Sequence, residues 1–446
     1  MALSGLEIYK KLPKTNCGDC GVPTCMAFAM KVAGGQAEIT ACPHVDKKVV
    51  AELGEAAAPP IRTVEIGAGE WAFKVGGELV LCRHEKTFIN PCGIGGIITD
   101  KMSDSEVDSR INAIKKLQFE RIGLTLHANL MAVKSDDPNK LAGLAKKVMD
   151  NTPACIMLMS ENVEALKAGL EAVKPRKPIL YSATKANGDK VAELAKSAGL
   201  PVVVKGNGLE EVAELTKKLS DAGLKDLLID TGARALKPAF QDHVHLRRTA
   251  IKKSFRALGY PTVVLTCEMT EDPILEALYA SIFVAKYGGI IILNHLRAEV
   301  LFPLLVERLN VYTDPQRPMA QSPGIYPINN PDDKSPVLVT SNFSLTYFIV
   351  SGELESGRFP SWLLVVNTEG LSVLTAWAAG KFSADVVGPF VKKCGIEGKI
   401  AHKKLIIPGV VAGISGELED ELKDWQIIIG PREGAHIIPF LKETWK

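Results

Sequence analysis

The chain has 446 residues, which is too long for one compact domain, so two or three domains are expected. Its net charge of +2, from 53 Lys and Arg against 51 Asp and Glu, provides no field that favours nucleic acid or an anionic membrane. No apolar run reaches the length of a transmembrane helix, and the N-terminus lacks the basic and apolar regions of a signal peptide. Nine cysteines, five of them scattered, suit a reducing compartment, so we expect a cytoplasmic protein.

Four cysteines fall within the first tenth of the chain: Cys17, Cys20, Cys25 and Cys42. Four thiolates can bind zinc or an iron–sulfur cluster. Only the first two form a Cys-x-x-Cys pair, and the fourth stands alone before a proline, which is more typical of cluster binding than of structural zinc. Gly18 and Gly21 let the backbone turn tightly and bring its N–H groups toward the sulfurs. We favour a [4Fe–4S] cluster, with zinc, two disulfides or inert thiols as the alternatives.

The residues after the third cysteine predict a short amphipathic helix over 26–32, ended by Gly34-Gly35. An Ala-rich run at 51–58 then precedes Pro59-Pro60. Two prolines cannot continue a helix and form a stiff spacer. A small cluster-binding domain is therefore predicted over residues 1–60.

Alternating apolar residues predict strands at 63–66, 71–75 and 78–82, and Gly76-Gly77 would join the last two as a hairpin. Eight apolar strands, each followed by a helix, come next. This alternation is typical of a (β/α)8 TIM barrel, because strands this apolar need cover on both faces. We predict such a barrel over 61–320, with an open doubly wound sheet as the alternative. Its strands are expected at 96–99, 124–133, 154–159, 178–181, 201–204, 227–229, 262–265 and 290–293.

The segment 311–334 contains five prolines and little periodicity, which predicts a second linker. Beyond it, four strands alternate with helices, as in an open sheet of the nucleotide-binding type. We therefore predict a Rossmann-like α/β domain over 321–446. Its strands are expected at 337–339, 362–366, 404–407 and 426–429.

The carboxyl ends of the predicted barrel strands carry polar residues, which is where function in a barrel would lie. They include no nucleophile–base pair, phosphate loop or metal-ligand spacing, so ordinary polar strand ends are favoured over catalysis. His243 and His245 fall two residues apart in a predicted helix and cannot face one ion, so we expect them at the surface. The polar strand ends are Asp100, Ser160, Ser182, Lys205, Asp230, Glu268, Asn294 and His295.

In the last domain each predicted strand runs into a loop rich in Gly, Ser, Thr and Ala, at 340–346, 367–373, 408–416 and 430–435. Ligands of open α/β sheets bind outside the carboxyl ends of the strands. Four such loops would form a broad, weakly charged floor, which suits a large planar cofactor with peripheral amides better than a dinucleotide. No Gly-x-Gly-x-x-Gly follows a strand and no P-loop is present. Ordinary tight βα turns are the alternative.

The cysteine spacing Cys17-x2-Cys20-x4-Cys25-x16-Cys42, the barrel, and the segment Thr-Glu-Gly-Leu-Ser-Val-Leu-Thr-Ala-Trp-Ala-Ala-Gly-Lys-Phe at 368–382 together resemble one family. It is the large (gamma) subunit of the corrinoid iron–sulfur protein of the reductive acetyl-CoA pathway. The similarity covers essentially the whole chain. The cysteine motif is shared with other cluster proteins, whereas the 368–382 segment and the order of the three parts are the specific features.

The resemblance implies a cobalamin-type corrinoid on the C-terminal domain. None of the eight histidines lies in an Asp-x-His-x-x-Gly motif, which fits a base-off cobalt without a protein ligand. Thr375 would lie beneath the cobalt. The contacts that the resemblance implies are Thr340, Asn342, Phe343, Thr346, Gly370, Leu371, Ser372, Val373, Thr375, Ala376, Gly430, Pro431, Arg432, Glu433, Gly434 and Ala435.

The resemblance also implies a methyl-group carrier, in which the cofactor rather than a catalytic side chain performs the chemistry. Co(I) would accept methyl from methyltetrahydrofolate through a separate methyltransferase and pass it to the nickel site of acetyl-CoA synthase/CO dehydrogenase, while the cluster reactivates Co(II). The implied partners are the small (delta) subunit, in a heterodimer, both of those enzymes and a reductive activator. Two alternatives are an iron–sulfur electron carrier and a stand-alone barrel methyltransferase that binds the pterin through Asp100, Asp230 and Asn294.

Overall fold

The computed structural model describes residues 5–33, 37, 39–46, 49, 58–314 and 318–445. The chain divides into two compact units between Tyr312 and Thr313, with residues 122–124 grouped with the second unit. The predicted helix end at Gly34-Gly35, most of the Ala-rich run at 51–58 and Pro315 lie outside the described residues. The domain boundaries at 60/61 and 320/321 stay predictions. In the described part of the chain, no helix is both long enough and apolar enough to cross a membrane.

The first unit begins with two short helices, α1 (Gly5–Lys11) and α2 (Cys25–Ala33), followed by the 3-10 helix η1 (Ile39–Ala41). Their packing is apolar, because Ile8, Phe28 and Val32 are almost fully buried together with two of the cysteines. The expected helix at 26–32 is therefore confirmed, with one extra residue at each end.

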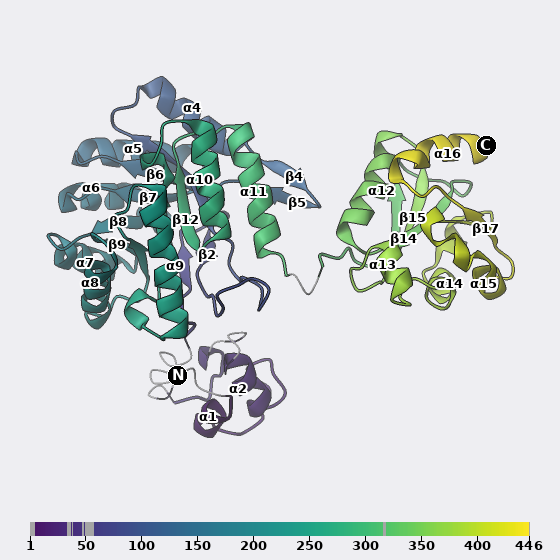
Figure 1. Ribbon diagram of the computed structural model, residues 1–446, viewed down its shortest axis with the longest axis horizontal. Helices are drawn as coiled ribbons and strands as arrows, with labels where there is room; N and C mark the ends of the chain where they lie inside the picture. Colours follow the sequence, from purple (N-terminus) through teal and green to yellow (C-terminus); the bar gives the residue numbers. More distant parts are fainter. Residues whose placement is uncertain are drawn as a thin grey trace. The chain divides into compact units, whose positions relative to one another are not determined.

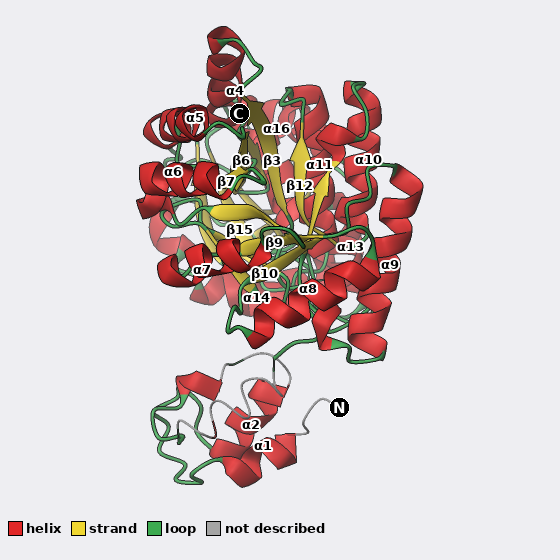
Figure 2. Cartoon of the chain, turned by 90° about the vertical axis from the view of Figure 1, so that its left-hand side faces the viewer, coloured by secondary structure: helices red, strands yellow, loops and turns green. Residues whose placement is uncertain are grey.

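Eight parallel strands form a closed barrel in the order β10-β11-β12-β3-β6-β7-β8-β9, which confirms the predicted (β/α)8 architecture. Helices α4–α11 lie outside the strands (Figures 1 and 2). The strands are β3 (Gly93–Thr99), β6 (Leu130–Lys134), β7 (Cys155–Met159), β8 (Ile179–Ala183), β9 (Val202–Lys205), β10 (Leu227–Asp230), β11 (Thr262–Leu265) and β12 (Gly288–Leu293). The helices are α4 (Asp104–Lys116), α5 (Pro138–Asn151), α6 (Val163–Val173), α7 (Gly188–Ala198), α8 (Leu209–Asp221), α9 (Leu236–Lys252), α10 (Pro273–Ala285) and α11 (Ala298–Tyr312).

Alternation along each strand separates two cores. In β7, Met157 and Met159 belong to the cluster inside the barrel, whereas Ile156 and Leu158 pack against the helices outside. Side chains of a strand alternate between its two faces, so a strand covered on both faces is apolar throughout. This is why the barrel strands are continuous apolar runs in the sequence.

The predicted hairpin across Gly76-Gly77 is wrong. The strands that pair are β1 (Val64–Ile66) and β2 (Phe73–Val75), and the chain beyond Gly77 is not a strand. The buried Glu78 carboxylate instead forms an ion pair with Arg247 at 3.0 Å. This distant partner holds the segment in place and stops it from folding back on β2.

Two further expectations for the first unit need correction. The strand predicted at 124–133 is split, because β5 (Leu124–Leu126) pairs with β4 (Phe119–Arg121) in a separate two-stranded sheet and only β6 joins the barrel. His243 is not at the surface: it is buried in α9, its Nδ1 lies 2.7 Å from the Ala239 carbonyl oxygen, and its ring packs against Phe283. His245 is exposed, as expected.

The second unit is a five-stranded sheet in the order β13-β15-β14-β16-β17. The four predicted strands are parallel, and β13 is an additional antiparallel edge strand inside the segment expected to be a linker. The strands are β13 (Gly324–Ile328), β14 (Val337–Ser341), β15 (Ser361–Val366), β16 (Lys404–Ile407) and β17 (Gln426–Ile429). The helices are α12 (Ser344–Ser356), α13 (Val373–Ala378), α14 (Ala384–Lys393), α15 (Ser415–Glu421) and α16 (Ile437–Thr444).

Candidate functional site

The four N-terminal cysteines lie on the small module of α1 and α2. Cys25 begins α2 and Cys42 follows η1, and both side chains are buried, with exposed fractions of 6% and 7%. Cys20 packs against the same apolar cluster, whereas Cys17 is exposed. All nine cysteines of the chain are described, and each carries a free thiol.

The loop that carries the first two cysteines is tightly curled. Gly18 and Gly21 have φ angles of 81° and 76°, which side-chain-bearing residues rarely adopt, and the Gly21 N–H donates to the Gly18 carbonyl at 2.8 Å. The Asn16 side-chain oxygen accepts a hydrogen bond from the Cys25 N–H at 2.8 Å, and the Asn16 N–H lies 3.4 Å from Cys25 Sγ. Hydrogen bonds from backbone N–H groups to cysteine sulfur stabilise bound iron–sulfur clusters. The backbone of the module therefore has features that suit a cluster.

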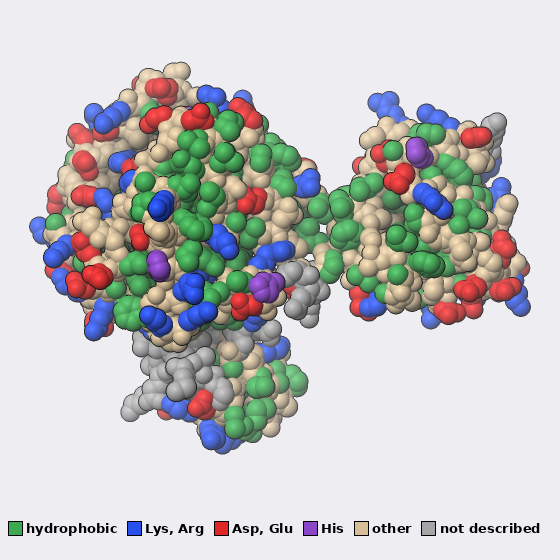
Figure 3. Space-filling view, viewed as in Figure 1, with side chains coloured by type: hydrophobic (Ala, Val, Ile, Leu, Met, Phe, Trp, Pro, Cys, Tyr) green, Lys and Arg blue, Asp and Glu red, His purple; other side chains and the backbone are tan. Residues whose placement is uncertain are grey.

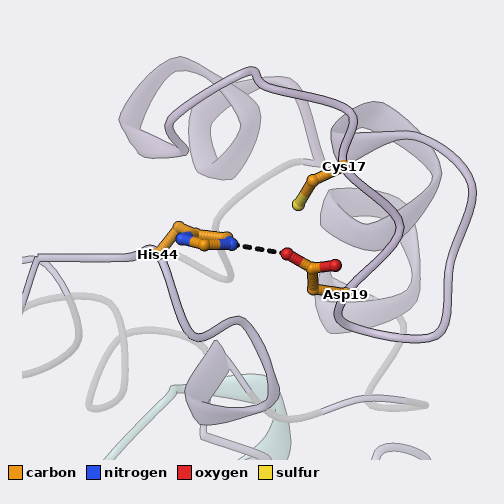
Figure 4. A group of neighbouring side chains, drawn as sticks. All are labelled: Cys17, Asp19 and His44. Atoms are coloured by element: carbon orange, nitrogen blue, oxygen red, sulfur yellow. Dashed lines mark hydrogen bonds and ion pairs between the residues drawn. The ribbon is translucent and has the colours of Figure 1, made fainter.

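Asp19 and His44 lie beside the exposed cysteine (Figure 4). His44 Nε2 is 2.6 Å from Asp19 Oδ2. The donor atoms of Cys17, Asp19 and His44 all lie within 4.8 Å of one another. The hydrogen bond with His44, followed by that with Cys17, lowers the pKa of the Asp19 carboxyl group, so Asp19 is ionised at neutral pH.

The second site is a pocket of about 260 Å³ at the carboxyl ends of strands β14 and β16, closed by the starts of helices α12 and α13 and by the loop after β17. Most of its lining is apolar, and the rest carries hydroxyl groups, backbone groups and the charged side chains of Arg432 and Glu433. Its lining residues are Leu338, Val339, Thr340, Thr346, Ile349, Val350, Ser372, Val373, Leu374, Ile406, Ile407, Pro408, Val410, Gly430, Pro431, Arg432, Glu433, Gly434 and Ile437.

Two buried hydroxyls at the end of β14 lack partners. Thr340 Oγ1 and Ser341 Oγ have no hydrogen-bond partner among the described residues, although their side chains are 1% and 0% exposed. Buried polar groups are normally paired, because an unpaired one loses its bonds to water without compensation. Thr340 lines the pocket and Ser341 does not. The hydroxyl of Thr340 therefore indicates a ligand with a polar atom in this pocket.

Asn342 shapes the site. Its Oδ1 accepts hydrogen bonds from the Thr368 N–H at 2.9 Å, the Thr368 hydroxyl at 2.8 Å and the Gly370 N–H at 3.0 Å. Gly370 has a φ of 77°, and a Cβ there would lie 2.9 Å from the Pro318 carbonyl oxygen, so a larger residue would distort the loop. These two residues fix the loop that leads into α13.

The implied corrinoid contacts divide between the pocket and its surroundings. Thr375 is exposed on α13, 3.0 Å from the Ser372 hydroxyl, whereas the Ala376 side chain is fully buried in the core. The residues on the pocket wall are Thr340, Thr346, Ser372, Val373, Gly430, Pro431, Arg432, Glu433 and Gly434. Those outside it are Asn342, Phe343, Gly370, Leu371, Thr375, Ala376 and Ala435.

Sequence reasoning missed the apolar part of the pocket, including Ile406 and Pro408. It also missed the apolar side chains nearby that face solvent: Ile349, Leu374 and Trp377 are 48%, 54% and 46% exposed. The available signal was the pair Leu374 and Trp377 on α13, one and four residues after the small-residue loop at 367–373. Exposed large apolar side chains gathered at a pocket mark a binding surface.

The carboxyl end of the barrel holds a pocket of about 440 Å³, but most of its charged groups are paired with one another, and Asp136 accepts a hydrogen bond from the Ser160 hydroxyl. The Asp230 carboxylate accepts hydrogen bonds from the Tyr181 hydroxyl at 2.6 Å, the Arg234 guanidinium at 2.8 Å and the Gly232 N–H at 2.8 Å. Burial would raise the pKa of Asp230, but the bonds from Arg234 and Tyr181 outweigh burial and lower it. Glu268 likewise accepts from Lys134 at 2.6 Å and from Arg234 at 2.5 Å.

Other polar strand ends are also bonded within the barrel, although the buried Ser182 hydroxyl has no hydrogen-bond partner among the described residues. Asp100 accepts from the Ser135 hydroxyl at 2.8 Å, and the Asn294 side-chain oxygen accepts from Arg110 at 2.9 Å. Together with Asp230, these are the residues that the pterin-binding alternative would use. Each of the three side chains already bonds another group of the protein.

The fold and the two sites define a modular α/β protein with a thiol-rich module, a parallel barrel and a pocket at the carboxyl ends of the strands of the second sheet. The chain belongs to the family of corrinoid/iron-sulfur protein large subunits and acetyl-CoA decarbonylase/synthase gamma subunits. A family model described as "CO dehydrogenase/acetyl-CoA synthase delta subunit" matches residues 63–441, and one described as "Putative Fe-S cluster" matches residues 12–44.

The chain is 44% identical over 444 residues to the corrinoid/iron-sulfur protein large subunit of Moorella thermoacetica, covering 99% of both chains. It is 36% identical to the acetyl-CoA decarbonylase/synthase complex subunit gamma of Archaeoglobus fulgidus, covering 99% of this chain and 98% of that one. Among solved structures, dihydropteroate synthase of Yersinia pestis is similar with a TM-score of 0.36 at 13% identity, covering 50% of this chain and 94% of that one.

Proposed function

We propose that this chain is a methyl-group carrier with a corrinoid on its second unit and a [4Fe–4S] cluster on its N-terminal module. When bound, a corrinoid in the Co(I) state would supply the nucleophile for methyl transfer from methyltetrahydrofolate, through a methyltransferase, to the nickel site of acetyl-CoA synthase. The observation that carries the proposal is the unpartnered Thr340 hydroxyl in the pocket at the carboxyl ends of β14 and β16. The name of the Moorella thermoacetica relative, which joins corrinoid and iron-sulfur, supports it.

The pocket is too small for a whole corrinoid. Its volume of about 260 Å³ is below the roughly 300–1,000 Å³ of sites that enclose a drug-sized molecule, and a corrinoid is larger than that. We infer that the pocket takes only the heterocyclic base of the corrinoid tail, with a polar atom bonded to Thr340. The exposed apolar side chains of Leu374 and Trp377 then remain available to the macrocycle.

Such an arrangement agrees with a base-off cobalt. Sequestering the tail base keeps it away from the metal, and no histidine is among the described residues that line the pocket. Thr375, at the exposed surface of α13, is too short and too weak a donor to replace an imidazole. Without a strong lower ligand, the low-coordinate Co(I) state is favoured.

The cysteine module would return an electron when the cobalt is oxidised to Co(II). Clusters held by four thiolates reach the low potentials that this reduction requires. Cys25 and Cys42 come from the apolar core of the module, and the Asn16 N–H points at one of the sulfurs. The residues therefore bind and shield the cluster, and the exposed Cys17 side faces the solvent or an electron donor such as a reductive activator.

Helix α10 provides a surface for the proposed small subunit. Ile274 and Leu278 are each 58% exposed and Leu275 is 37% exposed. Figure 3 shows hydrophobic side chains gathered on the barrel face that carries α10 and α11. A helix that is apolar on its outer face is normally covered by protein. We infer that the small subunit packs here, and that the methyltransferase and acetyl-CoA synthase bind the resulting heterodimer.

Metal content tests the proposal directly. After anaerobic purification from its host, the protein should contain about four iron atoms and one cobalt per chain. Reconstitution with a cobalamin-type corrinoid should give the absorption spectrum of a base-off species. Iron without cobalt, persisting after addition of corrinoid and small subunit, would leave only an iron–sulfur electron carrier.

A further inference from the structure

The protein holds the four cysteines of the module in place to different degrees. Cys25 and Cys42 are held in the apolar core, with exposed fractions of 6% and 7%, whereas Cys17 is exposed. The chain before Cys17 is tied to the core by the hydrogen bond between the Asn16 side chain and the Cys25 N–H. What holds the chain after Cys17 must come from the turn at Gly18–Gly21.

Asp19 occupies that turn, and its carboxylate reaches His44 across the site. His44 follows Cys42 by two residues, with Pro43 restricting the backbone between them. The 2.6 Å contact thus connects the loop of the first two cysteines to the segment of the fourth, 25 residues away in sequence. Figure 4 shows the Cys17 side chain pointing toward this pair.

We propose that Asp19 and His44 form a clasp that positions Cys17 as a cluster ligand and slows loss of the cluster at its exposed side. This inference rests on the proposed iron–sulfur site. The Cys17 thiol loses its proton when it binds iron, so its own hydrogen bond to Asp19 cannot persist in the loaded protein. The bond between Asp19 and His44 needs no thiol proton and can persist. The two residues are positioning residues, because they act through Cys17.

The Asp19 carboxylate should also affect the reduction potential of the cluster. A negative charge beside a cysteine ligand disfavours the reduced, more negative cluster, and net charge near the sulfurs is one determinant of the reduction potential. Removing the charge while keeping the shape, as in Asp19→Asn, should therefore shift the midpoint potential upward. A purely structural contact would not do so.

The experiment uses the full-length, anaerobically purified holoprotein and follows iron release to a ferrous chelator. Asp19→Ala and His44→Ala should each speed release about two- to fivefold, the range expected for loss of one hydrogen bond between half-exposed side chains. The double variant should be no faster than either single one, because both remove the same contact. His44→Gln, whose amide can donate to Asp19, should restore slow release.

Asp108→Ala serves as the matched control, because it removes an ion pair with Lys147, at 2.8 Å, on the outside of the barrel. It should leave both iron release and potential unchanged. Additive effects of the two Ala variants, or unchanged release together with an unchanged potential in Asp19→Asn, would overturn the clasp. Absence of iron from the unmodified protein would instead overturn the proposed cluster itself, so the two failures are distinguishable.

Discussion

Replacing Thr340 by Val tests the pocket at the end of β14 most sharply, because the stability of the second unit should rise while its affinity for the corrinoid should fall. Val has nearly the same shape as Thr but lacks the hydroxyl. In the unloaded protein that hydroxyl is buried and has no partner among the described residues. Its removal should therefore relieve a desolvation penalty of about 1 kcal/mol. The second unit should melt about 4 °C higher, given the usual size dependence.

Corrinoid binding should weaken in the same variant. If Thr340 bonds a polar atom of the ligand, the variant loses that bond and leaves the ligand atom buried and unpaired. The combined loss is about 1.4 kcal/mol, which corresponds to a tenfold higher Kd. Thermal unfolding of the unloaded protein and titration with a cobalamin-type corrinoid, followed by absorption, measure the two effects.

Ser341→Ala is the matched control. Ser341 also has a buried, unpartnered hydroxyl at the end of β14, but it does not line the pocket. This variant should be as stable as Thr340→Val or more so, and should bind corrinoid with unchanged affinity. The reasoning is refuted if Thr340→Val binds corrinoid normally, or if both variants weaken binding equally.

Four further predictions concern the rest of the chain. Cys42→Ala should lose the cluster but keep the corrinoid; Co(II) reduction by a low-potential donor, followed by absorption, should slow strongly, and full-rate reduction would contradict the reactivation role. Thr375→His should give cobalt a protein ligand, visible as a changed cobalt spectrum, and slow formation of Co(I). Asp230→Asn should lower barrel stability by about 2 kcal/mol, because it removes the buried carboxylate that bonds Arg234 and leaves Glu268 as the remaining charged partner, while the folded protein transfers methyl at its normal rate. Leu278→Glu should prevent heterodimer formation with the small subunit in gel filtration, with Asp189→Ala, on the outside of α7, as a neutral control.

The barrel could be predicted because both faces of its strands are covered, so burial leaves a continuous apolar signal. That same signal failed at 124–133, where β5 and β6 are both apolar but belong to different sheets. Gly76-Gly77 misled in a different way. Both residues have positive φ, as a hairpin turn would require, but Glu78 finds its partner on α9. Pairing partners distant in sequence are not encoded in local alternation.

Strand β13 was hidden by a proline. Pro327 lies inside β13 and has no N–H to donate to a neighbouring strand. The sheet order places β13 at an edge, where one side of the strand needs no partner, so a proline is tolerated there. A proline-rich segment therefore predicts a linker from the sequence, although the sheet can accommodate it as an edge strand.

The four cysteines and the small-residue loops could be recognised from residue type and spacing, because the chemistry requires them. The apolar part of the pocket could not, because Ile406 at the end of β16 is indistinguishable in sequence from a core isoleucine. The same holds for Thr340 and Asp230, which are both buried and polar at strand ends. The two residues differ only in their hydrogen-bond partners: Asp230 has several, and Thr340 Oγ1 has none among the described residues.

The presence or absence of a hydrogen-bond partner also distinguishes a residue that binds a ligand from one that stabilises the fold. At the barrel mouth every oxygen of Asp230 is satisfied by Tyr181, Arg234 or a backbone N–H, so a ligand would have to break existing bonds to bind. At the end of β14 the Thr340 hydroxyl has no partner among the described residues, so binding a ligand forms a hydrogen bond there without breaking one. Because a buried polar group without a partner destabilises the unloaded protein, its presence in a pocket is better explained by a ligand than by stability. The chemistry of this chain is therefore expected on the second unit, and we propose that the barrel is the scaffold on which partner proteins assemble.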